Sequence, residues 1–190
     1  MKSKNKLSIL RTSAAIISGY LALAVLFYLL AGYQLHYRNS RGNIEMPAAA
    51  SVTAELVEGS VVEQHFTMRI QRLQSVSVQW GTFHLANTGT ATVSLLREDS
   101  GEQIMSQTFD VADIADGGTT TLASEAPIEG LAGVPLILQI YTDSEAGSAA
   151  APMITAEDTE VEKLYINSEE TTGALCFSVV GEDYIWTGLH

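Results

Sequence analysis

The feature that most constrains this chain is one uncharged, strongly apolar run from Thr12 to Leu35. At about 1.5 Å per helical residue, a run of this length can cross a hydrocarbon core about 30 Å thick. A cleaved signal peptide has a shorter apolar core and small residues at both cleavage-determining positions, and neither Ala31 nor Gly32 completes such a pair. The sequence therefore predicts one retained transmembrane helix over residues 12–35.

Basic residues on either side of the run predict its orientation. Four Lys or Arg residues lie within residues 1–11, whereas only Arg38 and Arg41 follow the run closely. Positive charge stays preferentially in the cytoplasm. We expect a single-pass protein of the cell membrane, with a cytoplasmic tail over 1–11, a linker over 36–50 and an extracytoplasmic domain over 51–190.

Charge is divided unevenly along the chain. Residues 1–44 hold six Lys/Arg and no acids, whereas residues 45–190 hold four Lys/Arg against all 22 Asp/Glu, a formal charge of −18 compared with −12 for the whole chain. An acidic surface of this kind repels nucleic acid and anionic lipid headgroups. Nucleic acid is therefore not expected as a partner, whereas contact with the lipid bilayer is expected through residues 12–35.

Small residues recur at four-residue spacing within the apolar run. Ala14, Ser18 and Ala22 form one such series, and Ala15 with Gly19 forms another. This spacing allows close packing of helices in a membrane. Two interpretations stay open, namely contact with a polytopic membrane protein and the ordinary composition of a transmembrane helix.

Short segments of alternating apolar and polar residues fill the rest of the chain, a pattern typical of half-buried strands. The expected strands are Ser51–Glu58, Val61–Ile70, Leu73–Leu85, Thr90–Leu96, Gln103–Phe109, Thr119–Ala123, Val134–Thr142, Pro152–Thr155, Val161–Ile166, Gly173–Val180 and Asp183–Thr187. Turn signals at Asn87–Gly89 and Glu98–Gly101 predict two consecutive hairpins. One helical turn is expected over Val111–Asp116.

This succession of strands without alternating helices predicts an all-β fold, an antiparallel β-sandwich. Long connections over Glu125–Pro135 and Asp143–Pro152 favour a jelly-roll-like sandwich over an immunoglobulin-like one. Cys176 is the only cysteine, so the chain forms no internal disulfide. Its place in an alternating segment indicates a buried free thiol rather than a nucleophile.

Several segments together resemble a module of bacterial surface proteins. They are Leu73–Phe83, Ala86–Thr90, Thr92–Leu96, Asp99–Gly101 and Val111–Asp116. The module is a carbohydrate-binding-like jelly roll that follows the first transmembrane helix of membrane proteins linked to cell-surface polysaccharide. The resemblance covers about residues 51–180 and implies recognition of an envelope glycan. Further transmembrane helices would follow in those proteins, so we expect either a short single-span version or part of a longer protein.

Sugar-binding sandwiches combine an aromatic surface with side chains that hydrogen-bond ring hydroxyls. Trp186, Tyr141, His84 and Asn87 are the candidate ligand-binding residues. Trp80 shares the parity of the apolar residues Val76 and Val78, which indicates a core position.

Catalytic and metal sites find little support in the sequence. Asp110, Asp113 and Asp116 recur every third residue and are weak candidates for calcium, since Asp is also a common cap and turn residue. The remaining acids occur mostly as doublets, whose side chains point to opposite faces of a strand. No motif frames a nucleophile or cradles a phosphate. We expect no cofactor and no enzymatic activity.

Two functions follow as hypotheses. The first is a membrane-anchored recognition or accessory module for cell-envelope polysaccharide. The alternative is a single-span adaptor or structural protein that contacts a membrane protein partner. An envelope hydrolase would require two carboxyl groups facing each other across a cleft.

Overall fold

The computed structural model describes residues 12–28, 37–156 and 163–184. It consists of two separate bodies, of which the larger spans residues 39–182. The smaller body contains a helix over residues 12–28, which confirms the expected N-terminal helix. Within the described ranges, no helix is long and apolar enough to cross a membrane.

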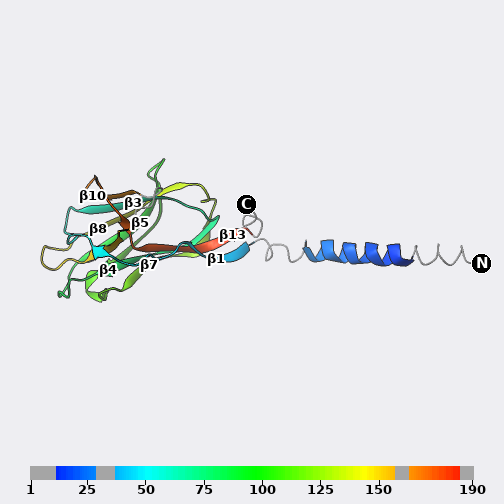
Figure 1. The fold of residues 1–190 in the computed structure, drawn as a ribbon, viewed down its shortest axis with the longest axis horizontal. Coiled ribbons are helices and arrows are strands. Elements are labelled where there is room, and N and C mark those ends of the chain that lie inside the picture. Colours follow the sequence, from blue (N-terminus) through cyan, green and yellow to red (C-terminus); the bar gives the residue numbers. More distant parts are fainter. Residues whose placement is uncertain (1–11, 29–36, 157–162, 185–190) are drawn as a thin grey trace, which may run out of the picture. The chain divides into compact units, whose positions relative to one another are not determined.

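The described residues from 37 onward are built almost entirely of strands (Figure 1). They are β1 (Tyr37–Ile44), β2 (Ser51–Val52), β3 (Val61–Thr67), β4 (Arg72–Gly81), β5 (Thr90–Arg97), β6 (Gln103–Asp110), β7 (Thr119–Glu129), β8 (Pro135–Thr142), β9 (Ala151–Thr155), β10 (Lys163–Ile166), β11 (Glu169–Thr171), β12 (Ala174–Leu175) and β13 (Phe177–Tyr184). A 3₁₀ turn, η1 (Val111–Asp113), lies between β6 and β7. The predicted all-β class is confirmed.

The strands form two antiparallel sheets packed as a sandwich. The first sheet has the order β1-β13-β4-β9-β12, with β7 paired to β4 and β2 paired to β9. The second sheet has the order β11-β10-β3-β8-β5-β6. In Figure 1, β3 and β10 lie in the upper part of the domain and β4 and β7 in the lower part.

Inward-facing side chains of both sheets form the core. In β3 and β8, buried residues alternate with partly exposed ones, which is the pattern expected of strands covered on one face. Trp80 is fully buried, as its parity with Val76 and Val78 predicts. Phe66 and Phe177 pack across the two sheets with ring centroids 5.2 Å apart. Such tight packing gives the loops a rigid support.

Cys176 lies in this core as a free thiol, as predicted. Burial raises the pKa of its thiol, so the group stays protonated and poorly nucleophilic. Of the two predicted hairpins, that of β5 and β6 is confirmed, with Thr90 opposite Asp110 and Leu96 opposite Gln103. The hairpin predicted at Asn87–Gly89 is wrong, because β4 and β5 lie in different sheets.

Two expectations about connections are wrong. The chain between Glu125 and Pro135 is not one long loop, because β7 continues to Glu129. A strand, β1, occupies much of the expected linker over residues 36–50. Both segments contain Pro, Gly or charged residues, which suit an edge strand as well as a loop.

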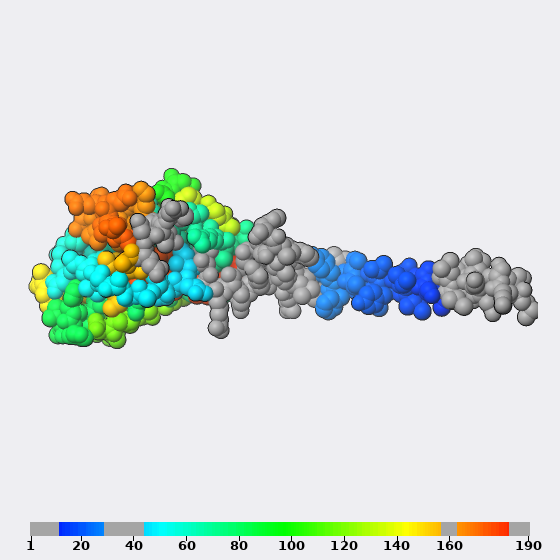
Figure 2. All heavy atoms as spheres, in the orientation of Figure 1, coloured from blue at the N-terminus to red at the C-terminus, as the bar shows by residue number. Residues whose placement is uncertain are grey.

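The segment expected as a strand over Ser51–Glu58 is a strand only at β2. Its backbone nevertheless stays bonded to the chain around β9, since Thr53 donates to Pro152 O at 3.1 Å and Leu56 to Ala150 O at 3.1 Å. Figure 2 shows this segment in cyan across one face of the domain. Alternation of apolar and polar residues in the sequence does not reveal irregular pairing of this kind.

Candidate functional site

The loop of residues 82–89 joins the two sheets, and an aspartate holds each of its ends. At the first end, Asp116 Oδ1 accepts hydrogen bonds from the backbone N–H of Thr82 at 2.8 Å and from its hydroxyl at 3.2 Å. At the second, Asp143 accepts from the backbone N–H and the hydroxyl of Thr90. We name these pairs the Asp116 clamp and the Asp143 clamp.

Both clamps stabilise the ionised carboxylate. The backbone N–H of Thr82 lowers the pKa of Asp116, and the Thr82 hydroxyl and nearby His84 act in the same direction. The backbone N–H of Thr90 likewise lowers the pKa of Asp143, with its hydroxyl as the next cause. Hydrogen bonds to the charged form have this effect because protonation would weaken them.

A strained turn follows the Asp116 clamp directly. Phe83 and His84 have φ of 54° and 57°, and the backbone N–H of Leu85 donates to Thr82 O at 3.0 Å. Positive φ at two successive residues matches a type I′ turn, which normally requires Gly, Asn or Asp. The turn exposes Phe83 and Leu85 at 38% and 42%. Strain of this kind persists where the surrounding structure enforces it, often at binding sites.

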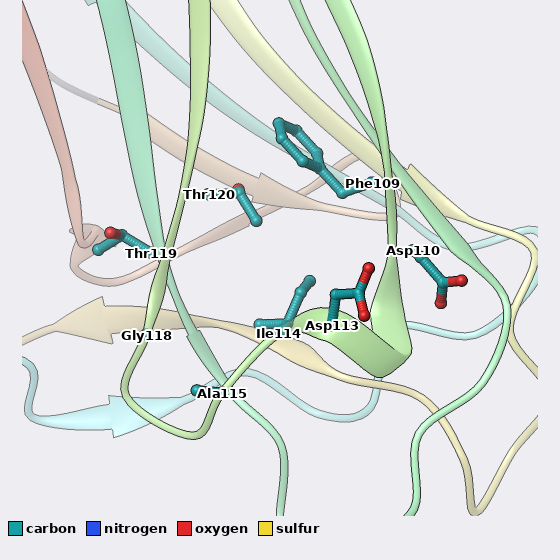
Figure 3. Close-up of a pocket in the computed structure, with 8 residues that line it drawn as sticks. All are labelled: Phe109, Asp110, Asp113, Ile114, Ala115, Gly118, Thr119 and Thr120. Carbon is teal, nitrogen blue, oxygen red and sulfur yellow. The ribbon is translucent and has the colours of Figure 1, made fainter.

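A pocket of about 340 Å³ lies beside the turn that carries Asp116, since Ala115 and Gly118 both line it. It is lined by Phe109, Asp110, Asp113, Ile114, Ala115, Gly118, Thr119 and Thr120. In Figure 3, the side chains of Phe109, Ile114 and Thr120 point into one common space, whereas Asp110 and Thr119 point away from it. The pocket therefore has an apolar floor with polar groups around it.

The pocket is connected to the buried core. The indole N–H of Trp80 donates to Thr120 Oγ1 at 2.8 Å, and the backbone N–H of Trp80 donates to Gly118 O at 2.9 Å. In return, Gly117 N donates to Trp80 O at 2.8 Å. A fully buried tryptophan thus fixes the start of β7, and a preformed site needs such support.

The candidate ligand-binding residues are distributed over different parts of the domain. His84 is exposed in the strained turn, with its Nδ1 3.6 Å from Asp116 Oδ2. Asn87 lies in the same loop but is buried, and its Nδ2 donates to Thr82 O at 3.3 Å, while its Oδ1 has no hydrogen-bond partner among the described residues. Trp186 lies outside the described residues. The structure therefore exposes the His84 side chain and buries that of Asn87.

Tyr141 lies on the outer face of the second sheet, where it pairs with Val61 and Thr92. Hydroxyl pairs continue this face across β5 and β6, since Thr92 Oγ1 lies 2.9 Å from Thr108 Oγ1 and Ser94 Oγ lies 2.8 Å from Ser106 Oγ. Tyr141 is therefore a half-exposed aromatic residue beside a row of hydroxyls. It belongs to a strand face, not to the pocket.

The three weak metal candidates do not form a common site. Asp110 caps η1 by accepting from Ala112 N at 2.9 Å, and Asp116 holds Thr82. Asp110 and Asp113 line the pocket, whereas Asp116 does not. Within the described ranges, no group of three His, Cys, Asp or Glu residues is placed to hold a metal ion.

The residues that build the pocket were missed by sequence reasoning. Phe109 and Thr120 follow the ordinary alternation of β6 and β7, and Ile114 lies in a short irregular segment. The nearest feature that the sequence predicted was a helical turn before Gly117-Gly118. This feature indicated a change of chain direction but not a cavity.

No family model matches the chain, and no curated protein matches it. Several solved structures are similar, among them the cysteine protease and lectin-like domains of Cwp84 from Clostridium difficile, with 10% identity and a TM-score of 0.46 over 65% of this chain. The chain spans about a third, 32%, of that structure. CsCBM6-3 from Clostridium stercorarium, solved with cellobiose, has 10% identity and a TM-score of 0.32 over 77% of this chain and 92% of its own. Likenesses this distant say nothing about what this chain binds.

Proposed function

We propose that this protein is a membrane-anchored, extracytoplasmic β-sandwich that recognises a carbohydrate of the cell envelope. The observation that carries the proposal is the pocket between β6, η1 and β7, with its apolar floor and polar surround. Its volume of about 340 Å³ suits one sugar unit, within the range of small-molecule sites.

The chemistry of the pocket matches the two kinds of surface that a sugar ring presents. Phe109 and Ile114 offer apolar surface for the C–H face of the ring. Asp113 supplies carboxylate acceptors for ring hydroxyls. The pocket lining contains no Lys or Arg, and the domain is strongly acidic, so the favoured ligand is neutral rather than anionic.

Binding rather than catalysis is supported by the state of Asp116. A glycosidase needs one carboxylic acid whose pKa is raised so that it can donate a proton. The Asp116 clamp has the opposite effect, because the Thr82 backbone N–H lowers the pKa of Asp116. Asp116 is therefore assigned to positioning the strained turn and not to acid catalysis.

The strand order supports a jelly-roll assignment within the sandwich class. Without the short strands β2 and β9 to β12, the orders are β1-β13-β4-β7 and β3-β8-β5-β6. Jelly rolls combine eight strands in two sheets, with successive strands crossing between them. We propose that β9 to β12 are additions between the seventh and eighth strands of that arrangement.

Anchoring in the cell membrane is supported by the sequence and by the exposure of the N-terminal helix. The uncharged run continues to Leu35 and is preceded by four basic residues. Within residues 12–28, Ile16, Leu23 and Phe27 are each more than 60% exposed. A helix that is apolar all round requires an apolar environment. Alkaline extraction should leave the chain in the membrane fraction; release into the supernatant would remove this part of the proposal.

Sugar binding is tested with the full chain in detergent micelles against a panel of neutral envelope glycans. The Asp113→Asn variant should weaken binding about tenfold, corresponding to the loss of one charge-assisted hydrogen bond. Asp99→Asn is the matched control, since it removes one carboxylate at the turn between β5 and β6, away from the pocket. Equal binding by the two variants would reject the pocket as the site.

The adaptor hypothesis is the second candidate, favoured by the strained turn that exposes Phe83 and Leu85. Exposed apolar side chains on a rigid turn are typical of protein contacts. In-membrane crosslinking from position 84 distinguishes the two functions. A stoichiometric protein partner together with indifference to every glycan would favour the adaptor.

A further inference from the structure

β7 forms an edge of the first sheet. It pairs with β4 and, among the strands that the structure describes, with no other. Natural proteins protect such edges with charged residues and proline, because unpaired backbone groups attract another strand. The second half of β7 has this protection in Glu125, Pro127 and Glu129, whereas the first half, residues 119–124, has no charge and no proline.

Hydrogen bonding in β4 determines which backbone groups of β7 face the open edge. The backbone N–H of Gln79 donates to Cys176 O at 2.9 Å, away from β7, and Gln79 lies opposite Thr119. Paired residues in an antiparallel ladder alternate between bonded and non-bonded pairs. The backbone N–H and C=O groups of Thr119, Thr121 and Ala123 therefore point outward from the sheet.

The sheet face beside this edge is also uncharged. Thr121 lies opposite Ser77, with their hydroxyl oxygens 2.8 Å apart, and Ser77 lies opposite Ser178 on its other side. Residues 45–190 carry a formal charge of −18, so two copies repel each other over most of their surface. This edge is a place where they can approach without opposing carboxylates.

We propose that two copies of this chain pair antiparallel along the first half of β7, with a two-fold axis at Thr121. In this register Thr119 of one copy lies opposite Ala123 of the second copy, so all three outward-facing residues are paired. Glu125 would lie opposite Gly117 of the second copy, and no acid would oppose another. The contact is self-complementary, as a two-fold interface requires. It does not depend on carbohydrate binding.

Cysteine crosslinking of the full chain in detergent micelles tests the register. Thr121→Cys should give a disulfide-linked dimer on mild oxidation, because the paired Cα atoms would be about 5.5 Å apart. Thr119→Cys is the control, since its copies would be four residues out of register, roughly 14 Å apart. The unchanged chain should stay uncrosslinked, as Cys176 is buried. A monomeric Thr121→Cys chain, or equal crosslinking at 119 and 121, would overturn the proposal.

A second measurement uses charge instead of a covalent bond. Thr121→Lys places two ammonium groups opposite each other across the two-fold axis and should raise the dimer dissociation constant at least tenfold. Thr121→Val keeps a β-branched side chain without charge and should leave it unchanged. Equal dissociation constants in sedimentation experiments would show that the edge is not the interface, whatever the result of glycan binding.

Discussion

The two clamps at the ends of loop 82–89 use the same chemistry in different surroundings. Each aspartate accepts a backbone N–H and a hydroxyl from one threonine. The Asp143 clamp is closely packed, since a Cβ on Gly89 would come within 2.8 Å of Asp143 Oδ1 and of Ser144 Oγ. The Asp116 clamp instead adjoins the strained turn and the pocket. The comparison indicates that the Asp143 clamp mainly stabilises the fold, whereas the Asp116 clamp positions the residues around the pocket.

The largest effect is expected from Gly89→Ala. Gly89 has φ of 95°, so alanine would be strained there and would also collide with the Asp143 clamp. We expect a loss of about 2 to 3 kcal/mol in the free energy of unfolding. Gly117→Ala, beside the Asp116 clamp, is the matched control, because φ is 70° but nothing lies within 4 Å of the added Cβ. It should cost about 1 kcal/mol. Equal losses in denaturant unfolding would contradict the difference in packing.

The next effect separates the roles of the two aspartates. Asp143→Asn should lower the melting temperature more than Asp116→Asn, because the packed clamp leaves less room for rearrangement. Asp116→Asn should instead weaken glycan binding more than Asp143→Asn does. Calorimetry on both variants measures the loss in melting temperature, and binding titrations measure the loss in glycan affinity. If the same variant had the larger effect on both melting temperature and glycan binding, the two aspartates would not have different roles.

Acid titration probes both clamps together. An aspartate whose pKa is lower in the folded state adds stability above its unfolded pKa, near 3.8, and loses it as the pH falls through the folded value. The melting temperature of the unchanged chain should therefore fall as the pH drops below about 4. The Asp116→Asn/Asp143→Asn double variant should show a shallower fall over the same interval. Parallel curves would mean that the pKa values of the two aspartates do not differ between the folded and unfolded states.

The smallest effect concerns strain in the turn. His84→Gly should raise the free energy of unfolding by about 0.5 kcal/mol, because glycine relieves the positive φ but costs more chain entropy. The His84 side chain is 86% exposed, so little packing is lost. Destabilisation by this substitution in denaturant unfolding would indicate that the contact with Asp116 outweighs the strain.

Alternation predicted the strands whose two faces differ in environment. β3 begins at the expected residue and β8 follows its expected range, because their apolar residues face the core at period two. The turn at Phe83 and His84 could not be predicted, since the residues there lack the side chains that favour positive φ and continue the alternation of β4. β7 was predicted too short because Pro127 is tolerated at a sheet edge.

The candidate site was predicted only in part. His84 was expected within the strand Leu73–Leu85 and lies instead in an exposed turn. Asp113 lines the pocket but was considered for a metal and not for a sugar. Asn87 was expected to contact ligand, whereas burial directs its amide to Thr82. The pocket depends on how the ends of β6 and β7 approach each other, which is a tertiary property that the local sequence does not encode.

The central claim, sugar binding in the pocket, is tested most directly by the indole N–H signals of the full chain in nuclear magnetic resonance spectra. The chain has two tryptophans, and the Trp80 indole bonds to Thr120 at the pocket wall. Trp80→Phe assigns the signal. A neutral envelope glycan that binds should shift the Trp80 signal in a saturable manner, and Asp113→Asn should raise the concentration required about tenfold. Saturable glycan binding that leaves Trp80 unshifted, or that shifts only the other tryptophan, would contradict the account.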